Sequence, residues 1–153
     1  MNNNKEIKTM VREKYEAIAN QPKDQNLSSC CGATGCCDGA DVYNIMADDY
    51  SKLEGYNPEA DLGLGCGLPT EFARIKEGDT VIDLGSGAGN DAFVARKLTG
   101  EKGKVIGIDF TGAMIARARE NAEKLKLNNV EFRLGDIEDM PVTANKANVI
   151  VSN

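Results

Sequence analysis

The second half of the sequence alternates short apolar runs with segments of helical periodicity, and this alternation restricts the possible folds most strongly. Helical patterns fill residues 90–100 and 112–127. The apolar runs are TVIDLG (80–85), KVIGIDF (104–110), VEFRLGD (130–136) and ANVIVSN (147–153). Nearly continuous apolar strands that alternate with helices are typical of a parallel sheet with helices on both faces. The sequence therefore predicts an α/β fold with right-handed crossover connections.

The first part of the chain follows a different pattern. Residues 5–20 carry apolar side chains at helical spacing, which predicts an amphipathic helix. Residues 22–42 are polar, rich in glycine and without periodicity, and they contain four cysteines, which predicts a loop. We therefore divide the chain into an N-terminal helix and cysteine-rich loop, residues 1–40, and a domain, residues 41–153.

Composition narrows the class of function. The chain has 18 basic and 24 acidic residues, a net charge of −6, and no long basic run, which argues against a nucleic-acid partner. No stretch approaches the roughly 18 apolar residues of a membrane span, and the polar start is unlike a signal peptide, so we expect a cytoplasmic protein without a membrane partner. The five cysteines then favour metal binding or catalysis over disulfides. There is no histidine, which removes the commonest general base.

A glycine-rich turn, DLGSGAGN, follows the first apolar run at residues 83–90. Its glycines permit a tight turn and let a ligand approach bare backbone. When Gly85 is counted as the first position of the pattern, the sixth is Asn90, so the dinucleotide fingerprint G-x-G-x-x-G/A is not met. The pattern D-x-G-x-G-x-G resembles instead the S-adenosylmethionine site of class I methyltransferases. That resemblance implies that the cofactor is bound by Asp83, Gly85, Ser86, Gly87 and Gly89.

Two more acidic residues close the second and third apolar runs. Asp109 lies 20 residues after Gly89, where a carboxylate can accept both ribose hydroxyls. Asp136 occupies the position that meets the adenine amino group in that family. The cofactor set is completed by Phe110, Met114 and Ile137, of which Met114 can pack on the adenine ring. The alternatives are that the glycines form only a turn, that Asp109 only caps a helix, and that Met114 belongs to the core.

Longer stretches resemble the arsenite methyltransferases over nearly the whole chain. They are VREKYEAIA, CCGATGCC, DDYSKLEGYNPEADLGLGCGLPTEFA, GDTVIDLGSGAGND and VIGIDFTGAMIARARENA. The part GYNPEADLGLGCGLP is specific, since generic methyltransferases lack it; the chain departs from the family at Glu16, where glycine is usual. The resemblance implies a Rossmann-like class I fold, with methyl transfer from S-adenosylmethionine to trivalent arsenic as a detoxification reaction. Two alternatives stay open: methyl transfer to carbon, oxygen or nitrogen, and an arsenic-binding protein that does not bind S-adenosylmethionine.

The cysteines distinguish these hypotheses. Cys66 lies between two glycines, which leaves its sulfur accessible. The resemblance implies that Cys66 is a catalytic thiolate that holds arsenic, with arsenite or its thiol conjugates and a thiol reductant as partners; the alternative is a small core residue. For Cys30, Cys31, Cys36 and Cys37 three hypotheses remain: arsenic or redox chemistry, with Cys30 and Cys31 as arsenic ligands; no role; or zinc, although adjacent pairs are unlike the usual spacing.

The family places its other arsenic-binding cysteines later in the chain, one of them directly after the fourth strand. The present sequence stops there, at Asn153. We therefore expect a sheet that is truncated after its fourth strand, and a chain that binds S-adenosylmethionine but is inactive alone. For Tyr50 and Tyr56 we expect packing in the core or on the surface rather than a place in the cofactor pocket.

Overall fold

The structure is a computed structural model that describes residues 3–21, 49–64 and 67–153. All five cysteines lie outside the described residues, as do the cysteine-rich loop and the boundary that we expect at residue 40. The predictions about thiol roles and about the domain division therefore stay predictions.

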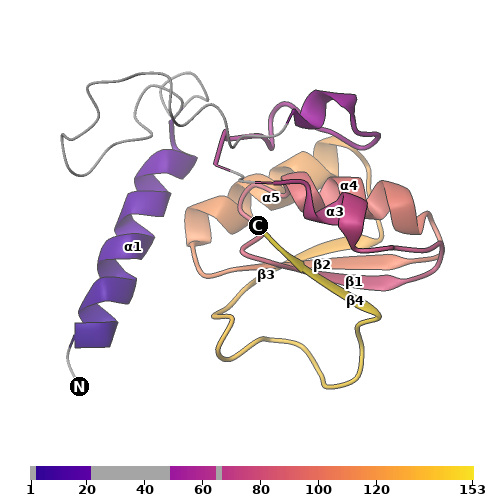
Figure 1. The fold of residues 1–153 in the computed structure, drawn as a ribbon. Helices are drawn as coiled ribbons and strands as arrows, with labels where there is room; N and C mark the ends of the chain where they lie inside the picture. The colour runs from indigo at the N-terminus through magenta and orange to yellow at the C-terminus, as the bar shows by residue number, and fades with distance from the viewer. Residues whose placement is uncertain (1–2, 22–48, 65–66) are drawn as a thin grey trace.

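A parallel sheet of four strands forms the centre of the described domain (Figure 1). The strands are β1 (Thr80–Leu84), β2 (Lys104–Asp109), β3 (Val130–Leu134) and β4 (Val149–Ser152), in the spatial order β3-β2-β1-β4. In the register, Val81 of β1 lies opposite Val105 of β2 and Val149 of β4. Each strand falls within two residues of a predicted apolar run at either end, because β-branched runs suit buried strands.

Two helices cover one face of this sheet and build the main core. They are α4 (Asn90–Thr99) and α5 (Gly112–Lys124), and both were expected from the helical periodicity. Phe93 of α4 and Ile115 of α5 are buried with Val81, Val105 and Phe132 of the strands. The one-turn helix α3 (Pro69–Phe72) begins at a proline, as the fixed φ of proline favours, and it contacts α4 and β4.

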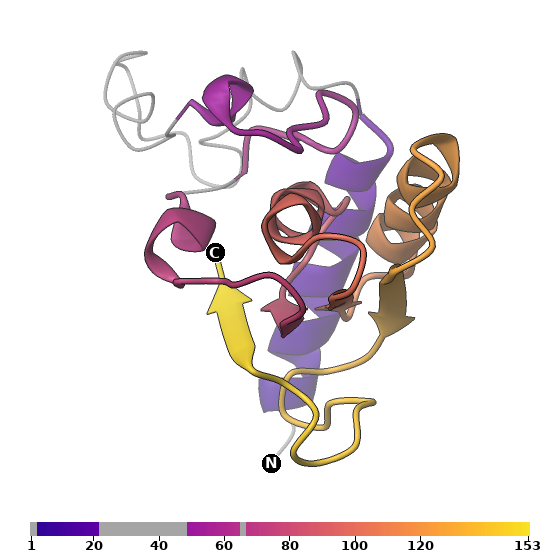
Figure 2. The same ribbon diagram turned by 90° about the vertical axis from the view of Figure 1, so that its right-hand side faces the viewer.

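The opposite face of the sheet carries a loop instead of a helix. Ile82, Ile106 and Ile108 are buried there, and Val142 and Ala147 of the connection between β3 and β4 pack against them. Figure 2 shows this connection on the side of the strands that lies opposite the helices. The Rossmann-like class I fold is thus confirmed, while within the described residues helices cover one face only.

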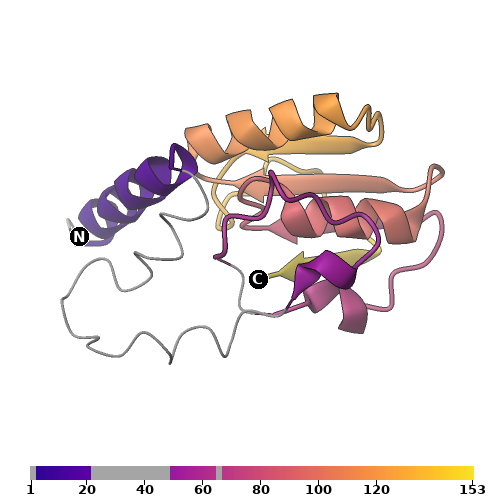
Figure 3. The same ribbon diagram turned by 90° about the horizontal axis from the view of Figure 1, so that it is seen from above.

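Helix α1 (Asn3–Ala19) confirms the predicted N-terminal helix and lies beside α5 (Figure 3). Arg117 of α5 donates a hydrogen bond to the carbonyl oxygen of Ala19 at 2.9 Å. Part of the apolar face that we expected on α1 is exposed to solvent, since Ile7 and Met10 are 46% and 64% exposed. Within the described ranges, no helix combines the length and apolar character needed to cross a bilayer.

Candidate functional site

A cavity of about 590 Å³ opens at the carboxyl ends of β1 and β2. Its size is typical of pockets for small ligands, and open parallel sheets bind ligands at this edge. The wall combines the glycine-rich turn, the end of β2, the start of α5 and parts of residues 49–64. Of the predicted cofactor residues, the cavity is lined by Gly85, Ser86, Gly87, Asp109, Phe110 and Met114.

The glycine-rich turn is tied to the neighbouring strand by its backbone. The amides of Gly85 and Ser86 both donate to the Ile108 carbonyl oxygen, at 2.9 and 3.0 Å. Gly87 has φ +51°, and a Cβ there would meet no atom within 4 Å, so this position faces open space. Gly89 has φ +100°, and a Cβ there would lie 2.7 Å from the Phe132 ring. Gly87 therefore keeps the cavity open, whereas Gly89 keeps the turn packed on the core.

Asp109 connects the turn to helix α5. One carboxylate oxygen accepts the Gly87 amide at 3.0 Å, and the other accepts the Thr111 amide at 2.8 Å. Because a carboxylate oxygen can accept more than one hydrogen bond, Asp109 retains capacity for hydroxyl groups of a ligand. Met114 lines the cavity and is also 2% exposed, so it has both the core role and the cavity position that the sequence suggested.

Asp83 lies beneath the turn and does not line the cavity. One oxygen of its carboxyl group accepts the amide of Ala92, and the other has no hydrogen-bond partner among the described residues. Burial raises the pKa of Asp83 well above its usual range, and the negative charges of Asp91 and Asp109 raise it further. The structure thus places Asp83 under the first turn of α4, where it supports the turn. Gly89 likewise lies outside the cavity wall.

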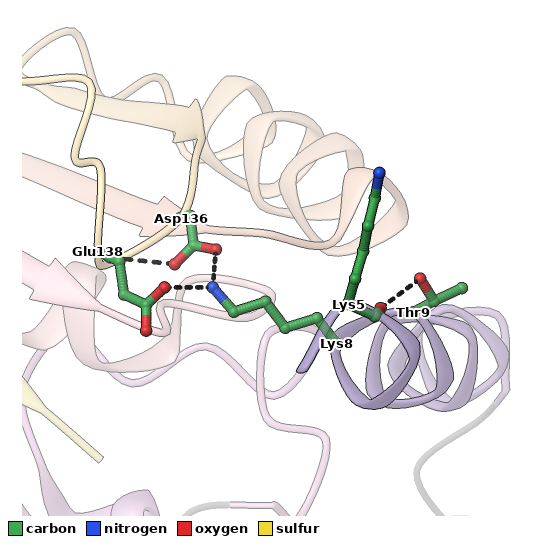
Figure 4. A network of polar contacts seen from close by, with 5 residues as sticks. All are labelled: Lys5, Lys8, Thr9, Asp136 and Glu138. Carbon is green, nitrogen blue, oxygen red and sulfur yellow. Dashed lines mark hydrogen bonds and ion pairs between the residues drawn. The ribbon is translucent and has the colours of Figure 1, made fainter. Parts of the chain in front are cut away.

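Asp136 and Ile137 also lie outside the cavity wall. The carboxylate of Asp136 accepts a hydrogen bond from the Lys8 ammonium group at 2.7 Å and another from the Glu138 amide at 3.0 Å (Figure 4). The hydrogen bond from Glu138 and then the one from Lys8 lower the pKa of Asp136, and the bond to Asp136 is the main cause of the raised pKa of Lys8. The expected adenine partner therefore faces helix α1, and Ile137 is exposed.

All three tyrosines in the described part of the chain line the cavity, a placement that the sequence did not reveal. They include Tyr50 and Tyr56, for which we expected only packing, and Tyr15, whose ring meets Phe110 edge-on at 6.4 Å between centroids. The Tyr56 hydroxyl donates to Asp61 at 2.8 Å. The signal available beforehand was the polar and aromatic stretch DDYSKLEGYNP at residues 48–58, a short distance before the glycine-flanked Cys66.

The cavity wall is acidic and aromatic. Asp49, Asp61, Asp91 and Asp109 contribute carboxylates, and the described lining residues include no lysine or arginine. Ser86 and Asn90 also line it, and each has a buried side-chain oxygen without a hydrogen-bond partner in the described part of the chain. Such a wall suits a ligand that carries positive charge and hydrogen-bond donors, because carboxylates and aromatic faces both attract cations. In the described ranges, no group of three or more acidic, cysteine or histidine side chains is arranged to hold a metal ion.

Comparison with known proteins agrees with this geometry. Residues 75–153 match a family described as a methyltransferase domain. The arsenite methyltransferase of Halobacterium salinarum is 44% identical over 97% of this chain and 39% of its own length. That of Aquipseudomonas alcaligenes is 32% identical over 94% of this chain and 40% of its own length. A solved S-adenosylmethionine-dependent methyltransferase from Aquifex aeolicus superposes with a TM-score of 0.52, at 36% identity over 72% of this chain and 54% of that one.

These similarities confirm the resemblance that the motifs indicated. The chain spans about two fifths of the length of both arsenite methyltransferases, 39% and 40%. The family match covers the whole sheet and the glycine-rich turn, and it includes Asp109 and Met114 of the cavity wall. The chain therefore belongs to the class I S-adenosylmethionine-dependent methyltransferase family.

Proposed function

We propose that this chain binds S-adenosylmethionine in the cavity and forms the donor part of an enzyme that methylates trivalent arsenic. The observation that carries the proposal is the convergence of the glycine-rich turn, Asp109 and Met114 on one cavity, in a chain 44% identical to an arsenite methyltransferase. Detoxification of arsenic in the cytoplasm is the setting that we propose for the reaction.

The described residues fit this cofactor. The open space at Gly87 admits a ligand against the backbone, and the Asp109 carboxylate has capacity for the two ribose hydroxyls. Phe110 and Met114 offer apolar surface to the adenine ring, and the acidic wall suits a cationic ligand. When bound, S-adenosylmethionine supplies a methyl carbon attached to a positively charged sulfur. The residues of this chain would hold that group in place and exclude water from it.

Thiolates of the chain would hold the acceptor. Trivalent arsenic is soft and binds sulfur, and we propose Cys66 as one of its ligands, with Cys30 and Cys31 as further candidates. The lone pair on arsenic is itself a nucleophile, so no side chain has to remove a proton for the attack. This agrees with a sequence that contains no histidine. The contribution of the protein is then orientation of the two reactants, an effect that can be worth several kcal/mol.

We propose that this chain binds the cofactor but does not complete the reaction alone. It spans about two fifths of the arsenite methyltransferases that it matches, 39% and 40%. The resemblance assigns to the remainder of those proteins the further thiolates that complete the arsenic site.

Calorimetric titration with S-adenosylmethionine tests the donor site. We expect saturable binding that Asp109→Ala weakens by at least about tenfold, the effect of losing hydrogen bonds to a buried carboxylate. Glu101→Ala is the control, because this exposed carboxylate lies outside the cavity wall and should leave the affinity unchanged. Absence of saturable binding to the parent chain would contradict the donor-site proposal.

A second titration, with arsenite, tests the acceptor. We expect binding that weakens in Cys66→Ser. If the chain binds S-adenosylmethionine while the arsenite affinity of Cys66→Ser equals that of the parent, the thiol assignment is wrong and the acceptor is of another class.

A further inference from the structure

A polar junction, in which Tyr50 and Asp91 are buried and Asn153 is exposed, joins four segments of the chain at the edge of the cavity. The hydroxyl of Tyr50 lies 2.6 Å from the Gly67 carbonyl oxygen and 3.0 and 3.1 Å from the two carboxylate oxygens of Asp91. The side-chain amide nitrogen of Asn153 lies 2.6 Å from the Tyr50 hydroxyl, 2.9 Å from the Gly67 carbonyl oxygen and 3.1 Å from Asp91. The end of β4, marked C, accordingly lies near α3 and the segment around η1 (Tyr50–Lys52) in Figure 3.

The donors and acceptors of this junction are well matched. The Tyr50 hydroxyl can donate one proton and the Asn153 amide two, and the acceptors are the Gly67 carbonyl, the Asp91 carboxylate and the Tyr50 oxygen. Burial raises the pKa of Tyr50, and the nearby charge of Asp91 raises it further, so the hydroxyl keeps its proton. Burial also raises the pKa of Asp91, an effect that the hydrogen bonds from Asn153 and Tyr50 oppose. Hydrogen bonds that share the buried Tyr50 and Asp91 side chains favour one arrangement of the segments that they join.

The junction has two functional neighbours. Tyr50, Asp91 and Asn153 all line the cavity, so an occupant of the cavity lies against the same side chains that hold the Gly67 carbonyl. Gly67 directly follows Cys66 in the sequence. The network therefore connects the cavity wall to the chain position next to the proposed arsenic thiolate.

We propose that Tyr50, Asp91 and Asn153 are positioning residues, which fix the backbone next to Cys66 against the cofactor cavity. This role rests on the proposed function, since it matters only if the cavity holds the methyl donor and Cys66 holds the acceptor. Two reactants must meet in a defined geometry for methyl transfer, and small displacements are costly in rate. Within the described residues, the junction joins Gly67, the neighbour of Cys66 in the sequence, to side chains of the cavity wall.

Hydrogen exchange of the peptide that covers residues 67–73 tests, without any ligand, whether the hydrogen bonds from Tyr50 and Asn153 hold the Gly67 backbone. The amides of Glu71 and Ala73 bond to the carbonyls of Leu68 and Pro69, so their exchange reports whether the start of α3 is held. We expect exchange about tenfold faster in Tyr50→Phe and in Asn153→Ala, the factor for loss of a typical hydrogen bond. The increase should be confined to this peptide.

Ser152→Ala is the matched control for Asn153→Ala. Ser152 is the residue before Asn153, and its hydroxyl donates to the carbonyl oxygen of Leu84 in β1 at 3.2 Å. This hydrogen bond lies outside the junction, so its loss should not alter exchange at residues 67–73. Equal exchange at residues 67–73 in the parent, Tyr50→Phe and Asn153→Ala would overturn the proposal. Faster exchange throughout the protein would also overturn the proposal, because it would show a general loss of stability instead of a local one.

The effect of the cofactor separates positioning from plain structural support. In the parent chain, saturating S-adenosylmethionine should slow exchange of residues 67–73, because its binding site shares three side chains with the junction. In Tyr50→Phe this slowing should disappear, although calorimetry still shows binding. Slowing that persists in Tyr50→Phe would overturn the proposal. If the parent chain does not bind the cofactor, the proposed function fails, and the ligand-free comparison alone decides whether these hydrogen bonds hold residues 67–73.

Discussion

Gly87 and Gly89 lie two residues apart in the same turn, and the structure predicts different consequences of adding a methyl group to each. Gly89 has φ +100°, beyond the left-handed region near +60° that other residues can use, which costs about 1–2 kcal/mol. Its Cβ would also lie 2.7 Å from the Phe132 ring and 2.9 Å from the Phe93 ring. Overpacking of this kind costs about 1–3 kcal/mol. Gly89→Ala should therefore lower the free energy of unfolding by about 2–5 kcal/mol, a large share of the roughly 5–15 kcal/mol typical of a domain.

Gly87→Ala should leave the fold nearly intact and damage the site. Its φ of +51° lies in the left-handed region, and the new Cβ would meet no atom within 4 Å. We expect a stability loss of about 1 kcal/mol from backbone strain alone. The methyl group would however stand at the wall of the cavity, so the affinity for S-adenosylmethionine should fall by at least about tenfold.

Urea unfolding followed by circular dichroism, together with calorimetric titration, measures both effects. Gly78→Ala is the control for strain, because Gly78 has φ +87°, no atom within 4 Å of its Cβ and no place in the cavity wall. The stability loss of Gly89→Ala should exceed that of Gly78→Ala by the overpacking term. Equal losses for these two variants would refute the steric argument, and unchanged affinity in Gly87→Ala would refute the position of the ligand.

Two further predictions concern charged groups. The pKa of the Asp83 carboxyl group is raised in the folded state, so the folded protein binds the proton of this group more tightly than the unfolded chain does. The parent protein should therefore lose stability as the pH rises above the ordinary aspartate pKa of about 3.9. Asp83→Asn should remove this loss, so urea midpoints should depend less on pH and exceed those of the parent near neutrality; identical pH profiles would contradict the burial argument. Lys8→Met should leave the global urea midpoint nearly unchanged, because its ion pair with Asp136 is exposed, but should speed hydrogen exchange in α1. The difference in exchange rate between Lys8→Met and the parent should shrink at high salt. Lys5→Met is the control, because the Lys5 ammonium group points away from Asp136 in Figure 4, and it should not speed exchange in α1. An equal increase in both variants would exclude the ion pair as the cause.

The local patterns of the sequence determined the elements of the fold. The strands, α1, α4, α5 and the glycine-rich turn all follow from hydrophobic periodicity and from glycine spacing, which act over a few residues at a time. The position of Asp109 at the end of β2 was predictable for the same reason, because parallel strands present their carboxyl ends at one edge. The resemblance to arsenite methyltransferases could also be recognised from the sequence, since its motifs are contiguous stretches of chain.

Only the tertiary structure decided which distant side chains meet. Lys8 reaches Asp136 across 128 positions, and Asn153 reaches Tyr50 across 103. The expected adenine partner is thereby paired with α1, and Tyr50, for which we expected only packing, joins the cavity wall. The loop that covers the second face of the sheet was likewise unforeseen. Periodicity records which face of an element is apolar, but it carries no information about which other element supplies the polar partner. That choice is made by the packing of the whole domain, through contacts between residues far apart in the sequence.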